Sequence, residues 1–420
     1  MRNCLFGPTL LLSQSFRAMR SAFGKHNAGG EGFDSLSPRV FFHKSEWLAE
    51  AKRRLAAGDA ALRPALERLL EDARAELGAT PLSVTQKTLT PPSGDKRDYI
   101  SFGIYWWPNP DTEDGLPWVR RDGEVNPMTQ TGETDAVRMK MMGNAVETLG
   151  LAYYFSGEEA FAEQAVRLIR TWFMAPDTRM NPNMTYAQGV PGRNDGRPWG
   201  LIEGTPLPRV ADAAGLLAGS AAWTEGDQHA LEGWFRELLE WMLTNENGIA
   251  EGKSHNNHGT WYDAQTASYA LFTRQPDVAR EILGNTSARI AAHIEPDGRQ
   301  PAELRRTRSF HYSVFNLQAF LVAARLGERV SLDLWGVESK DGRCLRKAID
   351  FLAEQALVKG EWPFEEIEGL APGKVFPILR MAAVSCGLPR YEALIAAAPD
   401  GPFRDARWQL LCPPPEEQVL

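Results

Sequence analysis

The chain has 420 residues, of which 43% are apolar and 24% are charged, as is usual in globular proteins, so a disordered chain or a coiled coil is excluded. It contains 46 Lys and Arg residues and 54 Asp and Glu residues, and the resulting formal net charge of −8 makes nucleic acid a poor candidate partner. No stretch of about 18 uninterrupted apolar residues is present to span a membrane as a helix, and the four cysteines form no CxxC pair typical of a zinc ribbon.

The N-terminal segment differs from the rest of the chain in charge. Residues 1–30 contain no acidic side chain, and residues 4–12 are a short apolar stretch that Pro8 interrupts. A flexible tail, a signal peptide and an organelle transit peptide share this pattern, and no clean A-x-A cleavage site decides between them. We expect residues 1–35 to be a flexible segment or a targeting peptide, with a secreted or periplasmic protein as the favoured outcome.

Helical periodicity begins at Ser45, which can cap a helix over 46–57, and continues in a second run over 60–77. Further helical runs are predicted at 134–156, 158–174, 207–222, 226–246, 258–273, 276–294, 309–327, 341–358 and 374–397. Short Gly, Pro or Asp breaks separate neighbouring runs, and the alternation typical of strands is scarce. Because helical hairpins cannot bury their apolar faces alone, we predict an all-α fold closed as an α/α toroid, with a stacked solenoid as the alternative.

Two segments without helical period, 80–133 and 176–206, are longer than usual connections, and such loops tend to be functional. Both are rich in Asn, Tyr, Trp, Arg and Gly, so we expect them to roof a cleft that binds sugar. The first contains Tyr-Trp-Trp-Pro-Asn-Pro at 105–110, where the prolines disfavour a helix. Its flat rings are expected to form an exposed platform for a sugar, with the packing of a hairpin corner as the alternative.

The first group of candidate catalytic residues lies at 254–263, where His255, Asn256, Asn257 and His258 stand together at the predicted start of a helix. A helix start offers free N–H groups and a positive dipole end, which favour a carboxylate or an oxyanion. The alternatives are ordinary capping or buried polar residues, and a zinc site from the two histidines, for which no third ligand stands at a familiar spacing.

The second group is the segment 305–312, which places three arginines within four residues and then ends in an imidazole and a phenol. On a helix, Arg305 and Arg308 would share a face with Tyr312. Nearby cations stabilise a phenolate, so the pKa of Tyr312 is expected to be lowered. A solvent-exposed charged face is the alternative.

Carboxylates offer a different chemistry. Asp195, Glu203 and Asp263 are candidates for the acid and base of an inverting glycoside hydrolase, although nothing in the sequence sets their separation. The sequence contains no GxSxG motif, no phosphate-binding loop and no dinucleotide-binding fingerprint. A non-catalytic polysaccharide-binding protein is a third possibility.

Taken together, three ordered blocks resemble the alginate-lyase-domain group of polysaccharide lyases, and most nearly polysaccharide lyase family thirty-eight, whose members cleave alginate or glucuronan. The blocks are Tyr99–Pro110 with Leu116–Pro127, Asn256–Asp263 and Glu303–Tyr312, with a fainter match at Asn181–Gln188. The similarity covers about residues 40–390. It implies that residues 36–420 form a single α/α toroid of six or seven hairpins and that the reaction is β-elimination without a metal or other cofactor.

The resemblance also implies catalytic roles. Asn257 and His258 would hold the carboxylate of the uronate together with an arginine, and Tyr312 would protonate the O4 leaving group. Tyr312 would also take the C5 proton when that proton and O4 lie on one face of the ring, and His258 when they lie on opposite faces. The Arg-Thr-Arg-Ser form favours Arg306 as the catalytic arginine, whereas helical spacing favours Arg305.

An anionic polysaccharide is the expected partner, and neither nucleic acid nor a membrane is expected. Mannuronate and glucuronate differ only at C2, so the catalytic residues do not choose between polymannuronate and glucuronan. The residues predicted to contact substrate are Arg305, Arg308, His311, Asn256, Trp261, Tyr105, Trp106, Trp107, Tyr186, Gln188 and Arg197.

Overall fold

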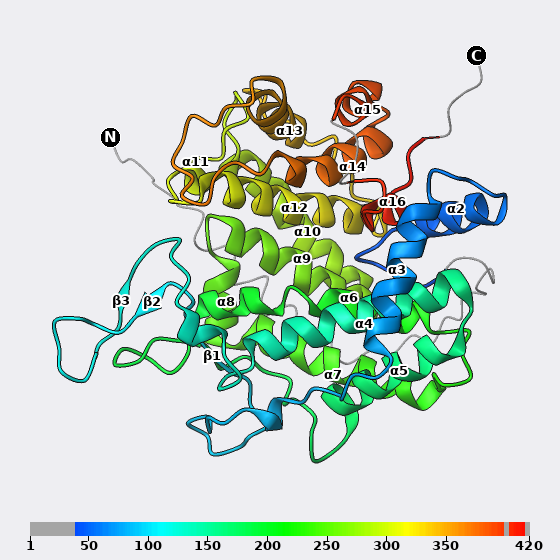
Figure 1. The fold of residues 1–420 in the computed structure, drawn as a ribbon. Coiled ribbons are helices and arrows are strands. Elements are labelled where there is room, and N and C mark those ends of the chain that lie inside the picture. Colours follow the sequence, from blue (N-terminus) through cyan, green and yellow to red (C-terminus); the bar gives the residue numbers. More distant parts are fainter. Residues whose placement is uncertain (1–37, 399–402, 416–420) are drawn as a thin grey trace, which may run out of the picture. The chain divides into compact units, whose positions relative to one another are not determined.

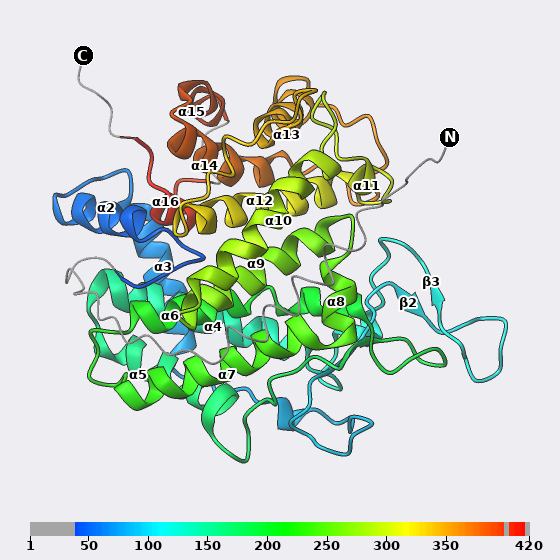
Figure 2. The ribbon, with the colours of Figure 1, turned by 180° about the vertical axis from the view of Figure 1, so that it is seen from behind.

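Helices account for most of the computed structural model, which describes residues 38–398 and 403–415 (Figures 1 and 2). Residues 37–420 belong to one unit and residues 1–36 to another. The expectation of a flexible or targeting segment at 1–35 lies outside the described residues.

The elements carry the labels of Figure 1. The helices are α2 (Ser45–Ala56), α3 (Arg63–Glu76), α4 (Ala136–Ser156), α5 (Glu159–Ile169), α6 (Leu207–Leu216), α7 (Glu225–Thr244), α8 (Glu246–Gly252), α9 (Asn257–Phe272), α10 (Pro276–His293), α11 (Pro301–Leu304), α12 (Ser309–Glu328), α13 (Leu345–Ala353), α14 (Phe376–Cys386), α15 (Pro389–Ala396) and α16 (Trp408–Leu411). The strands are β1 (Ile100–Phe102), β2 (Trp106–Trp107), β3 (Val119–Arg120) and β4 (Tyr186–Gly189). Short 3₁₀ and π segments are η1 (Val84–Gln86), η2 (Pro127–Gln130), η3 (Arg170–Met174), η4 (Pro198–Gly204), η5 (Glu354–Val358) and η6 (Pro372–Val375).

Alternate helices form an inner row. Helices α4, α6, α9, α12 and α14 each pack against the next member of this row. Helices α5, α7, α10, α13 and α15 follow them in sequence and pack on the row from outside, with α10 contacting both α9 and α12. The all-α toroid predicted from the helical runs is therefore confirmed.

Burial distinguishes the two sets of helices. Outer helix α13 buries Leu345, Ala348, Ile349 and Leu352, the spacing of a single apolar stripe. Inner helix α9 buries every residue except His258, as expected for a helix with neighbours on all sides. In the part of the chain that is described, no helix is both long and apolar enough to cross a membrane.

Two predicted helical runs end earlier than expected. The run predicted at 374–397 is divided into α14 and α15, because Gly387 adopts a left-handed conformation with φ of 62° and Pro389 starts the next helix. The run predicted at 207–222 ends at Leu216. The main helical assignments hold, and the differences are this division, shifted helix ends and the short helices α8 and α11, which were not predicted.

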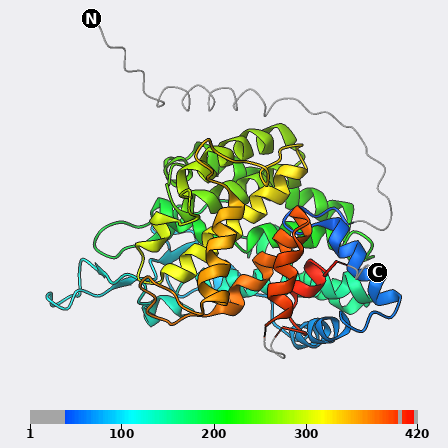
Figure 3. The same cartoon turned by 90° about the horizontal axis from the view of Figure 1, so that it is seen from above.

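The long loops are joined by two small β-pairs. Strands β1 and β4 are parallel, with Ile100 opposite Tyr186, so the first loop is paired with the second. Strands β2 and β3 are antiparallel, with Trp106 opposite Arg120. The β2–β3 hairpin extends from the helices on the side where α8 and α11 lie (Figures 1 and 3).

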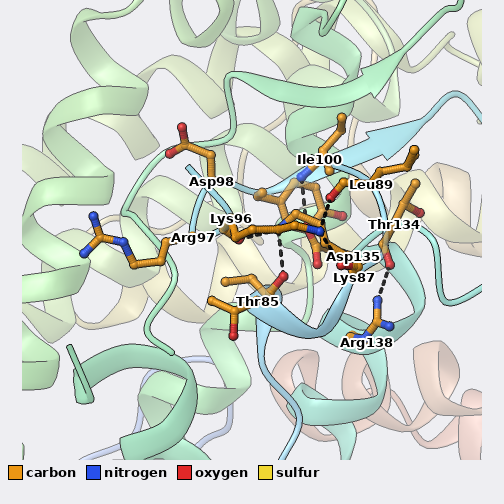
Figure 4. A network of polar contacts seen from close by, with 12 residues as sticks. Thr85, Lys87, Leu89, Lys96, Arg97, Asp98, Ile100, Thr134, Asp135 and Arg138 are labelled. Atoms are coloured by element: carbon orange, nitrogen blue, oxygen red, sulfur yellow. Dashed lines mark hydrogen bonds and ion pairs between the residues drawn. The ribbon is translucent and has the colours of Figure 1, made fainter. Parts of the chain in front are cut away.

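A buried ion pair fastens the first loop to α4 (Figure 4). Nζ of Lys87 lies 2.9 Å from Oδ2 of Asp135, and neither side chain is exposed to solvent. The same carboxylate oxygen accepts the backbone N–H of Ile100 at 3.0 Å, and Lys87 also donates to the carbonyl groups of Val84 and Lys96. Burial raises the pKa of Asp135 to about 6 and lowers that of Lys87. This network fixes β1, and with it the wall of the site, against the start of an inner helix.

Candidate active site

The two candidate catalytic segments meet where α9 and α12 begin. These helices pack against each other, and Trp261 of α9 donates its indole N–H to the carbonyl group of Phe315 in α12 at 3.1 Å. Glu303 of α11 bonds to Asn257 at the first position of α9. The Asn-His segment and the Arg-Tyr segment, about 50 positions apart in sequence, therefore share one site.

Asn257 is held by a buried carboxylate that no sequence motif marked. Glu303 is 1% exposed, and its two oxygens accept the backbone N–H of Asn257 at 2.7 Å and the side-chain amide at 2.6 Å. Burial raises the pKa of Glu303 to about 6, against the lowering effects of Asn257, Arg306 and His258. Oδ1 of Asn257 has no hydrogen-bond partner among the described residues. The side-chain amide of Asn257 is therefore fixed in orientation, and its oxygen is left without a hydrogen-bond partner in the described part of the chain.

His258 is positioned by a second buried carboxylate. Its Nδ1 lies 2.7 Å from Oε1 of Glu251, whose side chain is 1% exposed. A carboxylate accepts hydrogen bonds, so Nδ1 is the ring nitrogen that donates to Glu251, and Nε2 takes no part in this contact. Helix α8, which carries Glu251, was not predicted, and a single acidic residue gives no sequence signal for this role.

Arg306 stacks on the ring of Tyr312, with the guanidinium carbon 3.7 Å from the ring centroid. Asp122, in the turn after β3, holds Arg306 through Nε and Nη2 at 3.0 and 2.8 Å. Arg305 is exposed and lines a separate surface pocket with Glu295. Of the two arginines left open by the sequence, Arg306 is the one that contacts the phenol.

The hydroxyl of Tyr312 donates to the hydroxyl of Tyr105 at 2.7 Å, and Arg308 donates to Tyr105 at 3.3 Å. Tyr312 is only 7% exposed. Burial is the largest cause that raises its pKa, and Tyr105 adds to the rise, which Arg306 opposes. The prediction of a lowered pKa for Tyr312 was therefore wrong, because desolvation outweighs the neighbouring cation.

Three residues predicted to contact substrate are engaged elsewhere. Trp261 is 4% exposed and its ring packs 5.0 Å from Phe315. Gln188 is 7% exposed, and its Oε1 accepts a hydrogen bond from Arg197 at 2.7 Å. Asn256 caps α9 by accepting the backbone N–H of His258 at 3.1 Å. Their side chains contribute to the core and to the helix start, and contact of these three residues with substrate stays a prediction.

The predicted exposed platform is half-buried. Trp106 and Trp107 form β2. The guanidinium carbon of Arg121 lies 4.9 Å from the centroid of the Trp107 ring. Tyr105 points to Tyr312 instead of standing free. The rings are therefore covered in part by arginines and by the site itself.

The remaining predicted contacts lie at the border of the site. His311 is half-buried and stacks on Phe315 with ring centroids 5.8 Å apart, and burial, followed by nearby cations, lowers its pKa to about 4. Arg308 forms an ion pair with Glu368. Tyr186 is half-buried in β4.

The carboxylates considered for a hydrolase do not form a pair. Glu203 is half-buried, accepts a hydrogen bond from Tyr99 at 2.7 Å, and has its pKa raised to about 7 by desolvation. Asp263 is buried in an ion pair with Arg289 at 2.6 Å. Asp195 is exposed. Of the three, Asp263 is engaged by an arginine, and the other two differ in exposure.

The two histidines considered for zinc, His255 and His258, differ in exposure and in contacts. His255 is exposed, while His258 is bonded to Glu251. Over residues 38–398 and 403–415, no group of three or more His, Cys, Asp or Glu side chains is arranged to hold a metal ion.

Comparisons with known proteins match this arrangement. The family model described as alginate lyase matches residues 83–362. The crystal structure of an alginate lyase from Bacteroides ovatus is 37% identical, with a TM-score of 0.85 over 89% of this chain and 99% of that chain. Alginate lyase A1-III from Sphingomonas species A1 is 16% identical and shares the fold, with a TM-score of 0.58 over 92% of this chain and 100% of that chain. A variant of that enzyme complexed with a tetrasaccharide is 15% identical with a TM-score of 0.59, over 92% of this chain and 100% of the other. A search of curated proteins gave no match. The chain belongs to the alginate lyase family and is a polysaccharide lyase.

Proposed function

We propose that this lyase cleaves a 1,4-linked polyuronate, either the polymannuronate of alginate or glucuronan, by metal-independent β-elimination that leaves 4,5-unsaturated oligosaccharides. One observation carries the proposal. The Arg306–Tyr312 stack and the two carboxylate-held residues, Asn257 and His258, converge at the starts of α9 and α12. The related enzymes are named alginate lyases, which favours alginate as the substrate.

The first requirement of the reaction is stabilisation of negative charge on the uronate carboxyl group. The C5 proton is weakly acidic, and its removal places charge on that group. Arg306 is proposed to face this charge as a cation, and Asn257 to offer the amide hydrogen that Glu303 does not use. Both side chains are fixed by carboxylate acceptors, so little reorganisation is needed as the charge develops.

The second requirement is proton transfer. In mannuronate and glucuronate the C5 proton and O4 lie on one face, and we assign both transfers to Tyr312. The Tyr312 phenolate takes the C5 proton, the C5–H electron pair forms the C4=C5 double bond, the C4–O4 bond breaks, and O4 takes the proton from the phenol so formed. For a guluronate residue, whose C5 proton is on the other face, Nε2 of His258 is the proposed base.

The test is a substrate panel. The purified protein, with a chelator present, is incubated with polymannuronate, polyguluronate, glucuronan and hyaluronan while ultraviolet absorbance is followed. We expect a new absorbing double bond on polymannuronate or glucuronan. Absence of this signal on every polyuronate would remove the proposal, and new reducing ends without absorbance would indicate hydrolysis. Dependence of the rate on added metal would refute metal independence.

The location and the domain boundary are proposed from the same function. A polymeric uronate is met outside the cytoplasm, so we place the protein in the periplasm or outside the cell. Residues 36–420 would then act as a single lyase domain. Cell fractionation tests the location, and a variant lacking residues 1–35 is expected to keep full activity.

A further inference from the structure

Two arginines and two tryptophans form an alternating stack, which we call the Arg–Trp ladder: Arg193, Trp106, Arg197 and Trp199. The guanidinium carbons of Arg193 and Arg197 lie 5.2 and 5.5 Å from the ring centroid of Trp106. Arg197 also lies 5.3 Å from the ring of Trp199. Such cation–π contacts hold a guanidinium in a fixed plane without neutralising its charge.

Gly103 makes the close stacking possible. A Cβ atom at this position would lie 2.6 Å from Cδ1 of Trp106 and 2.7 Å from Nη2 of Arg197. Any larger residue would push the tryptophan and the arginine apart. The ladder is therefore a packed arrangement that the backbone accommodates, not a chance meeting of surface side chains.

The charge of the ladder has no acidic partner in contact. Arg193 donates to the carbonyl group of Trp118 at 3.0 Å, and Arg197 donates to the amide oxygen of Gln188 at 2.7 Å. Within the described ranges neither arginine has an ion pair, and Nε of Arg197 has no hydrogen-bond partner. Arg306 and Arg308, by contrast, are each paired with a carboxylate. Neither guanidinium of the ladder is thus in contact with a carboxylate among the described residues, and Glu203 and Glu251 act on Arg197 only from a greater distance.

The ladder borders the proposed active site at both ends. Trp106 directly follows Tyr105, whose hydroxyl is bonded to Tyr312. At the other end, η4 carries Trp199 and packs against α8 and α9, and the second of these helices carries His258. Trp199 is 48% exposed, so its ring is open to solvent beside the site.

We propose that the ladder is a binding subsite for a uronate unit beyond the two that the cleaved bond joins. The ring of Trp199 covers the C–H face of the sugar, and the guanidinium groups of Arg193 and Arg197 bind its carboxylate. We infer an anionic sugar as the ligand because a flat apolar ring, that of Trp199, lies beside guanidinium groups that no carboxylate of the described residues contacts. This inference rests on the proposed function, since the subsite would bind another unit of the same polymer that the active site cleaves.

The test compares Trp199→Ala and Arg193→Ala with wild type on polymannuronate and on its trisaccharide. We expect each variant to lose about fivefold or more in kcat/KM on the polymer, mainly through KM, and less than about twofold on the trisaccharide. Trp199→Phe, which keeps a flat ring, is expected to recover most of the loss. Trp335→Ala is the matched control, because Trp335 lies after the far end of α12. This variant is expected to leave kcat/KM unchanged on both substrates.

Binding is measured in parallel, so that the two proposals can fail separately. Oligosaccharides of increasing length are titrated by calorimetry into Tyr312→Phe protein with and without Trp199→Ala. Tighter binding of longer oligosaccharides, lost with Trp199→Ala, supports the subsite even if no polyuronate is cleaved. Equal binding and equal kcat/KM in wild type and Trp199→Ala overturn the subsite and leave the lyase proposal standing.

Discussion

Glu303 is expected to set the acid side of the activity profile, through its two bonds to Asn257. The carboxylate accepts both the backbone N–H and the side-chain amide of that residue. Once protonated, one of its oxygens becomes a donor and must give up one of the two bonds. Glu303→Gln imposes the same deficit at every pH, because a Gln amide accepts through one oxygen only.

The magnitude follows from the raised pKa. Burial moves the pKa of Glu303 from its ordinary value of 4.5 to about 6 in the folded protein. The folded state therefore binds the proton more tightly than the unfolded chain does. The contribution of Glu303 to stability is fully present below pH 4.5 and is lost as the pH rises to 6, by about 2 kcal/mol at about 1.4 kcal/mol per pKa unit.

Urea unfolding of wild type and Glu303→Gln at pH 4.5 and at pH 7 measures this term. The free energy of unfolding of wild type, relative to the variant, is expected to fall by about 2 kcal/mol between these two pH values. In the lyase assay, wild-type kcat/KM is expected to fall more steeply below about pH 6 than above it, whereas the variant is about 10-fold less active at neutral pH and lacks this additional fall.

Glu240→Gln is the control, since it removes the same charge from an exposed position on α7. A stability difference between wild type and Glu303→Gln that is equal at both pH values would refute the reasoning. An unchanged acid limb in the variant would show that another group controls activity at low pH.

Three further predictions concern the site and its support. Because burial raises the pKa of Tyr312 above its ordinary value of 10.0, wild-type kcat/KM is expected to rise through mildly alkaline pH without a plateau, and a plateau near neutral pH in the ultraviolet assay would argue against a phenolate base. Arg306→Lys is expected to lower kcat/KM by about 100-fold and Arg305→Lys by less than about twofold, because only the first contacts the phenol; equal losses would contradict this assignment. Asp135→Asn, which leaves Lys87 unpaired in the interior, is expected to lower the free energy of unfolding by about 3–5 kcal/mol in urea, and a loss under about 1 kcal/mol would count against it.

The sequence predicts most of this fold because the helices are long and their apolar periodicity is clear. The starts of α9 and α12 were each placed within one residue. The shorter helices α8 and α11 were missed, since four to seven residues carry too little periodicity to detect. The break at Gly387 and Pro389 was visible as a Gly–Pro signal, but the flanking apolar residues continued the period across it.

The candidate site was predictable only in its residue types. Clustered amides, imidazoles and arginines are unusual in sequence and marked the segments 254–263 and 305–312, within which the family resemblance pointed to Asn257, His258 and Arg306. The acids that hold them, Glu251 and Glu303, carry no such mark, because their role depends on burial beside a helix that is distant in sequence. The direction of the Tyr312 pKa shift was missed for the same reason.

The parallel pairing of β1 with β4 has a consequence for engineering the substrate range. The pairing sets Ile100 opposite Tyr186 and Phe102 opposite Gly189, so each strand finds its partner in the other long loop. A chimera that imports one loop from a relative would match a foreign strand with a native one and lose that register. Recombination is therefore expected to succeed when the two long loops that carry β1 and β4 are both taken from the same relative.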